Sequence, residues 1–88
     1  MEKNINELPE AGKRGEAIRE LEEYVKEHAD EKCLMQLAEL LYAEGRMTDA
    51  LNRFNAVVRL NAGNLKALNY VKMINDILNY YNKDLLNP

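Results

Sequence analysis

The sequence is poor in cysteine and in residues that break helices. Its 88 residues include one cysteine, two prolines and four glycines. The single cysteine, Cys33, cannot form an internal disulfide or supply a cysteine-rich metal site, so the chain needs no oxidising compartment. Few prolines and glycines, beside abundant Leu, Ala, Glu, Lys, Asn and Tyr, favour helices joined by tight turns. We therefore expect an all-α protein in a reducing cytoplasm.

Long apolar runs and clusters of basic residues are also missing. No uninterrupted apolar stretch approaches the ~20 residues that cross a bilayer, and residues 1–10 lack the apolar region of a signal peptide. The net charge is −3, and Lys and Arg are interspersed with acids. Because nucleic-acid binding draws on clustered positive charge, we expect no contact with nucleic acids. We also expect no contact with membranes, and we expect a cytoplasmic location.

The chain does contain enough apolar material for a small core. Hydrophobic residues make up 47% and charged residues 31%, which is typical of a globular chain rather than a disordered one. A chain of this size buries only roughly 60–65% of the surface that its unfolded form exposes. We therefore predict a single domain, residues 1–88, with a thin stability margin.

The sequence repeats itself with a period of 33 to 34 residues. A shift of 33 places residues 12–29 on residues 45–62, with Ala17 on Ala50 and Leu21 on Phe54. A weaker shift of 34 pairs Lys32, Leu34, Leu37 and Leu40 with Lys66, Leu68, Val71 and Ile74. In each copy the apolar positions form one stripe of an α-helix. The four segments therefore correspond, in chain order, to the second, first, second and first helix of a repeated helical pair.

Start and stop signals agree with four helices. The expected helices cover Gly15–His28, Glu31–Glu44, Thr48–Leu60 and Leu65–Tyr81. Asp30 and Asn64 are predicted N-caps, because their short side chains accept hydrogen bonds from free backbone N–H groups of the next turn. Gly45 and Gly63 are predicted at helix C-terminal positions that require a positive φ.

The two ends of the chain are less regular. Ile5 and Leu8 occupy the apolar positions of a preceding first helix, but Pro9 would break that helix after about one turn. The two leucines after Asp84 either dock on the last helix or fray. The predicted segments are 1–14 (irregular or short helical), 15–30 (second helix of a truncated repeat), 31–63 (central repeat), 64–81 (capping helix) and 82–88 (tail).

The central segment resembles the tetratricopeptide repeat family, a helical pair of roughly 34 residues. The matching positions are Leu34, Leu37, Ala38, Leu41, Ala50 and Phe54, with Ala62 where the family usually has proline. The resemblance implies antiparallel helical hairpins stacked as a short right-handed α-solenoid, one full repeat between two partial ones. Ala38 and Ala50 would lie where helices approach closely, and Lys72 and Asn75 fit the polar outer face of a terminal helix.

The resemblance also implies a concave peptide-binding groove lined by the first helices of the pairs. The corresponding residues are Lys32, Met35, Gln36, Glu39, Tyr42, Lys66, Asn69, Tyr70, Met73 and Asp76. A clamp for terminal carboxylates, found in part of the family, is not expected, because Met35, Glu39 and Tyr70 replace its Lys, Asn and Arg. Glu39 and Asp76 favour basic or mixed-charge peptides. The alternative is that these are ordinary half-exposed residues.

No metal site, cofactor site or catalytic constellation can be assembled from the sequence. His28 is expected to cap a helix C-terminus, and no other histidine or second cysteine is present to complete a metal site. Cys33 falls in the first turn of a helix, where the helix dipole would lower its pKa. Without a second thiol or a nearby base, it is not expected to act as a nucleophile.

The remaining charged and aromatic residues also have structural interpretations. Glu22 and Lys26 form a favourable i,i+4 pair on an acidic, solvated helix face. Tyr70, Tyr80 and Tyr81 are expected to be packing or interface aromatics rather than base-stacking groups.

The sequence therefore predicts a non-enzymatic protein-interaction module that holds a peptide or helix of an unidentified partner. The alternative is a homo-oligomerisation module that uses the incompletely covered stripe of Ala17, Ile18, Leu21 and Val25.

Overall fold

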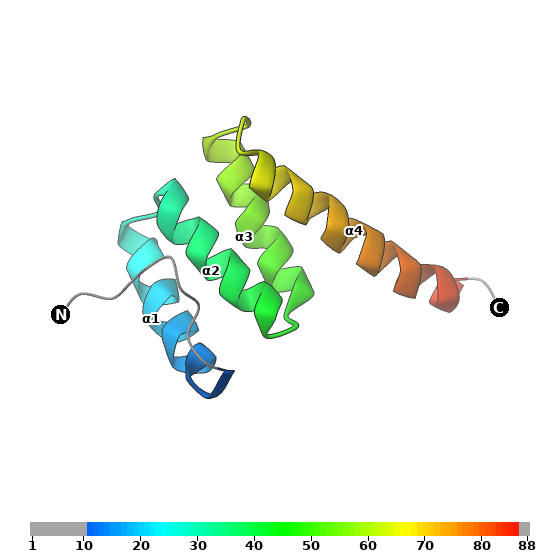
Figure 1. Cartoon of the computed structure of the whole chain (residues 1–88), viewed down its shortest axis with the longest axis horizontal. Helices are drawn as coiled ribbons and strands as arrows, with labels where there is room; N and C mark the ends of the chain where they lie inside the picture. Colours follow the sequence, from blue (N-terminus) through cyan, green and yellow to red (C-terminus); the bar gives the residue numbers. More distant parts are fainter. Residues whose placement is uncertain (1–10, 87–88) are drawn as a thin grey trace.

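Four α-helices follow one another in the computed structural model, which describes the backbone of residues 11–86 and the side chains of residues 12–80 (Figure 1). The elements are η1 (Ala11–Lys13, a 3₁₀ turn), α1 (Arg14–Glu27), α2 (Glu31–Ala43), α3 (Met47–Leu60) and α4 (Leu65–Leu86). The all-α prediction is confirmed. The predictions for Ile5, Leu8 and Pro9 lie outside the described residues.

The expected helix boundaries differ from the observed ones mainly at α4. This helix ends at Leu86 rather than at Tyr81. The residues between these two positions include no glycine or proline, and the next proline is Pro88, so nothing in the sequence stops the helix earlier.

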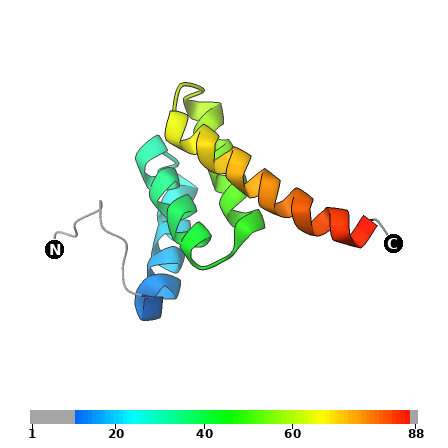
Figure 2. The same cartoon turned by 45° about the vertical axis from the view of Figure 1, so that its right-hand side comes forward.

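Each helix packs against the next one in the chain. α1 contacts α2, α2 contacts α3 and α3 contacts α4, as expected for adjacent helical hairpins. In both views the C-terminal half of α4 extends beyond α2 and α3 (Figures 1 and 2). The predicted stacking of hairpins is confirmed, and among the described elements α4 packs mainly against α3.

Small and large residues interlock in the core. Ala38 and Ala50 are fully buried, and so are Leu37, Leu41 and Phe54. The alanines allow close approach of α2 and α3, and the larger side chains fill the space beside them. On the outer side of α4, Lys72 and Asn75 are exposed, as predicted for a terminal helix.

Three of the four predicted cap and turn residues act as expected. Asp30 Oδ1 accepts a hydrogen bond from the Cys33 N–H at 2.8 Å. Asn64 Oδ1 accepts one from the Ala67 N–H at 3.0 Å. Gly45 has a φ of 81°, a left-handed conformation that other residues adopt at a cost.

The prediction of a positive φ at Gly63 is wrong. The side chain of Asn61 provides the turn instead, because its Oδ1 accepts a hydrogen bond from the Gly63 N–H at 3.0 Å. Such a side-chain turn replaces the left-handed backbone conformation that a glycine would otherwise supply.

Hydrogen bonds between residues about one repeat apart in the sequence connect the turn between α3 and α4 to the start of α2. Glu31 Oε2, at the start of α2, accepts hydrogen bonds from Asn61 Nδ2 at 3.0 Å and from Asn64 Nδ2 at 2.7 Å. A carboxylate that receives two amide donors makes stronger hydrogen bonds than a neutral acceptor. The start of α2 is thereby joined to the connection between α3 and α4.

Candidate functional site

Tyr70 of α4 contacts both α2 and α3 through its aromatic ring. The ring stacks on Phe54 of α3, with centroids 4.3 Å apart and planes 9° apart. Tyr42 of α2 meets it edge-on, at 5.1 Å and 70°. Aromatic pairs in these geometries contribute about 0.5–1.5 kcal/mol beyond the burial of their area. The ring of Tyr70 is therefore held in one orientation against α2 and α3.

Polar contacts hold the other end of the Tyr70 side chain. Its hydroxyl donates to Glu39 Oε2 at 3.2 Å, and Lys66 Nζ forms an ion pair with the same oxygen at 3.0 Å. Burial, followed by the Glu39 charge, raises the pKa of Tyr70 above its ordinary value. The hydrogen bond from Lys66 to Glu39 raises the pKa of Lys66. The hydroxyl therefore remains a donor and the amine stays charged at neutral pH.

Direct contacts thus unite four of the predicted groove residues: Glu39, Tyr42, Lys66 and Tyr70. We call these four residues, together with Phe54, the Tyr70 cluster. Its polar part is open to solvent, because 66% of the Lys66 side chain and 20% of the Glu39 side chain are exposed. The Lys66 ammonium balances the charge of Glu39, so the expected repulsion of acidic partners by Glu39 is weakened.

The other predicted groove residues differ in exposure. Lys32, Asn69, Met73 and Asp76 are exposed, whereas Met35 and Gln36 are half-buried. Met35 packs against the hydrophobic core, which limits its contact with a partner. Asp76 pairs with Lys72 at 3.3 Å, one turn away on α4.

Phe54 and the contacts between repeats were not predicted as parts of the site. The sequence places Phe54 in the core, and it is fully buried, yet it also supports the ring of Tyr70. Glu39 and Tyr70 are 31 residues apart, close to the repeat period. A search for complementary polar residues at that separation could have found this contact.

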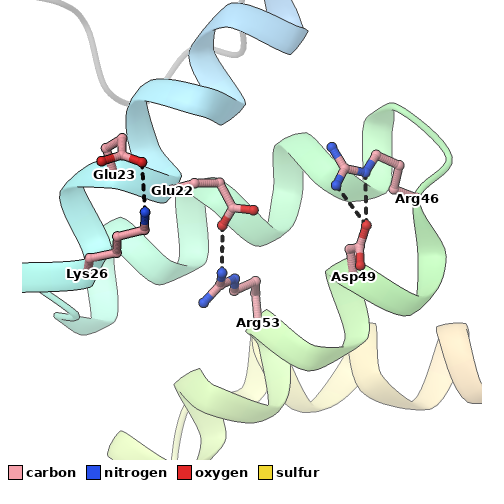
Figure 3. A network of polar contacts seen from close by, with 6 residues as sticks. All are labelled: Glu22, Glu23, Lys26, Arg46, Asp49 and Arg53. Atoms are coloured by element: carbon pink, nitrogen blue, oxygen red, sulfur yellow. Dashed lines mark hydrogen bonds and ion pairs between the residues drawn. The ribbon is translucent and has the colours of Figure 1, made fainter.

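A second polar network lies over α1 and α3 (Figure 3). Glu22 of α1 forms an ion pair with Arg53 of α3 at 2.6 Å. Lys26 forms its direct ion pair with Glu23, at 2.8 Å, rather than with Glu22, whose order relative to Lys26 is also favourable. The hydrogen bond to Glu23 raises the pKa of Lys26. Glu22 therefore links α1 to α3.

His28 takes the predicted position, whereas the expectation for Cys33 is wrong. His28 is the C-cap of α1, and its ring lies 4.7 Å from the ring of Tyr24. Burial, followed by the hydrogen bond and charge of Asp30, raises the pKa of Cys33. A raised pKa means that less of the thiol is in the reactive thiolate form at neutral pH than in a free cysteine.

Among the described side chains, those of residues 12–80, no three His, Cys, Asp or Glu residues gather as ligands for a metal ion. No helix within residues 11–86 is long and apolar enough to span a bilayer.

The surface predicted for self-association is partly covered. Ile18 and Val25 are buried, with 3% and 6% of their surface exposed. Ala17 and Leu21 are half-buried and pack against the same core. Burial thus removes two of the four stripe residues from any contact between copies.

Comparison with protein families explains this arrangement of helices. The model of the bacterial transcriptional activator domain matches residues 1–71, which is most of the chain. The chain belongs to this family. The family has a TPR-like helical fold, so the predicted resemblance to tetratricopeptide repeats is confirmed. Domains of this kind are generally protein-interaction modules without catalytic activity.

A curated relative supports the same assignment. Anaphase-promoting complex subunit 7 of Arabidopsis thaliana, a TPR protein, is 36% identical over 53 residues. The match covers 60% of this member of the bacterial transcriptional activator domain family and 10% of the Arabidopsis protein. The comparison with solved structures gives no significant match.

Proposed function

We propose that this chain is a non-enzymatic protein-interaction domain that binds a segment of a partner protein on the face shared by α2 and α4. The observation that carries the proposal is the Tyr70 cluster, an aromatic ring fixed by three helices beside a solvent-exposed lysine. A side chain already held in place loses little conformational entropy when a partner binds. Tyrosine is among the residues that are enriched at hot spots of protein interfaces.

The residues around the cluster suit recognition of a mixed apolar and polar segment. Met73 is 43% exposed, and its flexible thioether adapts to different apolar partners. Lys66 uses one contact on Glu39, and its ammonium has three donors, so it retains capacity for a partner acceptor. This combination favours a partner segment with an apolar anchor and an acceptor beside it.

Charge pairing favours a protein partner over a nucleic acid. The family is described as a domain of transcriptional activators, so its partner would belong to a protein assembly that acts in transcription. Among the described residues, carboxylates pair with six cations: Arg14, Lys26, Arg46, Arg53, Lys66 and Lys72. Such cations are less available to phosphates, and the net charge is −3. We therefore propose that the domain binds a protein rather than a nucleic acid. The proposed location is the cytoplasm.

Capture of partners from the native cell lysate tests this proposal. The double variant Tyr42→Ala, Met73→Ala removes an aromatic contact and an exposed side chain from the proposed surface. Leu68→Ala is a matched control, because Leu68 is also a half-exposed apolar residue of α4, at 38%, but faces away from the Tyr70 cluster. We expect the double variant to lose the captured partner while the control retains it.

Circular dichroism of all proteins ensures that the comparison is made between folded domains. Undiminished capture by a folded double variant would remove this face from the interaction. Equal loss in the double variant and in Leu68→Ala would refute the assignment to the α2 and α4 face as well.

A further inference from the structure

An apolar stripe continues along α4 beyond the Tyr70 cluster. It consists of Tyr70, Met73, Ile77 and Tyr80, which we call the α4 stripe. The separations of three, four and three residues keep these side chains on one side of the helix. The same spacing forms the seam along which two helices pack in coiled coils.

The outer part of this stripe is exposed in the described structure. Tyr80 is 66% exposed and Met73 is 43% exposed, while Ile77 is half-buried. The core of α4 lies on an adjacent side, where Ile74 is buried and Leu78 packs against the core cluster. Both views show this part of α4 extending past α2 and α3 (Figures 1 and 2).

The chemistry of the stripe selects against an extended peptide. An extended segment needs partners for its backbone N–H and C=O groups, and these groups are costly to bury unpaired. α4 offers none from its own backbone, which is engaged in its helix. Within the stripe, Met73 and Ile77 provide no hydrogen-bonding group beyond a weakly accepting sulfur, and the Tyr70 hydroxyl already donates to Glu39. A helix satisfies its own backbone groups and presents only side chains.

We propose that the α4 stripe is the docking seam for an amphipathic α-helix of the partner protein. This inference rests on the proposed function and specifies the conformation of the partner. The partner helix lies along α4, with apolar residues at three- and four-residue spacing against Met73, Ile77 and Tyr80. Its inner end reaches the Tyr70 cluster, where Lys66 meets a polar or acidic residue.

The exposed area favours a partner helix over a second copy of this chain. Four partly exposed side chains provide a few hundred Å², whereas a stable protein interface of standard size buries roughly 800 Å² on each partner. A partner helix that continues from the stripe onto Tyr42 and Lys66 adds area on the face next to the seam. Pairing of two α4 stripes alone would leave those residues outside the contact.

Binding of synthetic peptides to the full chain tests the proposal. The probe is an amphipathic peptide of about 18 residues, five helical turns, with leucines at three- and four-residue spacing. A scrambled peptide of the same composition is the control. Methyl NMR of Met73 and Ile77 reports contact with the stripe. We expect shifts of both methyl signals with the amphipathic peptide and at least tenfold weaker binding of the scrambled one.

Two variants locate the contact on α4. Tyr80→Glu places a charge in the stripe, whereas Asn79→Glu adds the same charge at an exposed position that faces away from it. We expect Tyr80→Glu to weaken binding by about tenfold or more, as for loss of an interface anchor, and Asn79→Glu to change it less than twofold. Circular dichroism confirms that both variants remain helical.

The possible outcomes separate this inference from the proposed function. Equal binding of both peptides, absent methyl shifts at millimolar peptide, or unchanged binding by Tyr80→Glu would each overturn the helical seam. Methyl shifts that depend on the concentration of the chain alone would identify a second copy as the occupant and also overturn it. If lysate capture needs Tyr42 and Met73 but survives Tyr80→Glu, only the seam is refuted. If capture survives all of these changes, the proposed function fails too.

Discussion

Replacing Ala50 by leucine tests the packing that defines the central hairpin. Ala50 is fully buried on α3, and Ala38 is fully buried on α2. Added methyl groups at such a site force side chains off their rotamers or move the backbone, which costs about 1–3 kcal/mol. For a domain of this length, each kcal/mol lowers the melting midpoint by roughly 4–8 °C. We therefore expect Ala50→Leu to melt at least ~4 °C below the parent.

Thermal and urea unfolding followed by circular dichroism measure this change. Asn52→Leu is the control, because it adds a leucine at an exposed position of the same helix. The control should change the stability by no more than about 0.5 kcal/mol, as is usual for surface positions. An unchanged midpoint in Ala50→Leu would mean that α2 and α3 do not meet closely at this residue, and the repeat register would be wrong.

Three further predictions concern the caps, the turns and pH. Asn64→Ala removes the N-cap of α4 and a hydrogen bond to Glu31, so urea unfolding should show a loss of about 1–2 kcal/mol; a loss below ~0.5 kcal/mol would contradict the role of the cap. Gly45→Ala should cost about 1–2 kcal/mol because φ is 81°, and Gly63→Ala should cost less because its φ is not left-handed, so the reverse order in thermal unfolding would refute the assignment of the turns. The raised pKa of Tyr70 stabilises the fold below pH ~10, and this contribution is lost as pH rises through the folded-state pKa. Tyr70→Phe should therefore lose less stability than the parent between pH 9 and 11, and equal slopes would argue against the buried hydroxyl.

Repeat spacing made much of the fold predictable. The apolar stripes and the small residues Ala38 and Ala50 repeat at helical spacing, so the number, order and approximate ends of the helices follow from local periodicity. Asp30 and Asn64 were also predictable, because an N-cap depends on a side chain and the N–H groups of the next turn. These features need no knowledge of distant contacts.

The polar contacts were less predictable because several of them span one repeat. Glu22 has an acceptable local partner in Lys26, yet the packing of the helices places Arg53 closer. Gly63 resembles a left-handed turn residue, but the Asn61 side chain provides the turn without a positive φ. The pKa of Cys33 is likewise raised by its burial and by Asp30, neither of which its position in the first turn of a helix predicts.

The sequence by itself determined the helices, the repeat order and the family, because helical periodicity and small-residue positions are local properties of the chain. Only the tertiary structure decided which side chains form the candidate site. The contacts of Tyr70 with Tyr42, Phe54 and Glu39 arise because packing brings three helices together. Tertiary packing also decided which side of α4 is buried against α3 and that Met73 and Tyr80 stay exposed on another side.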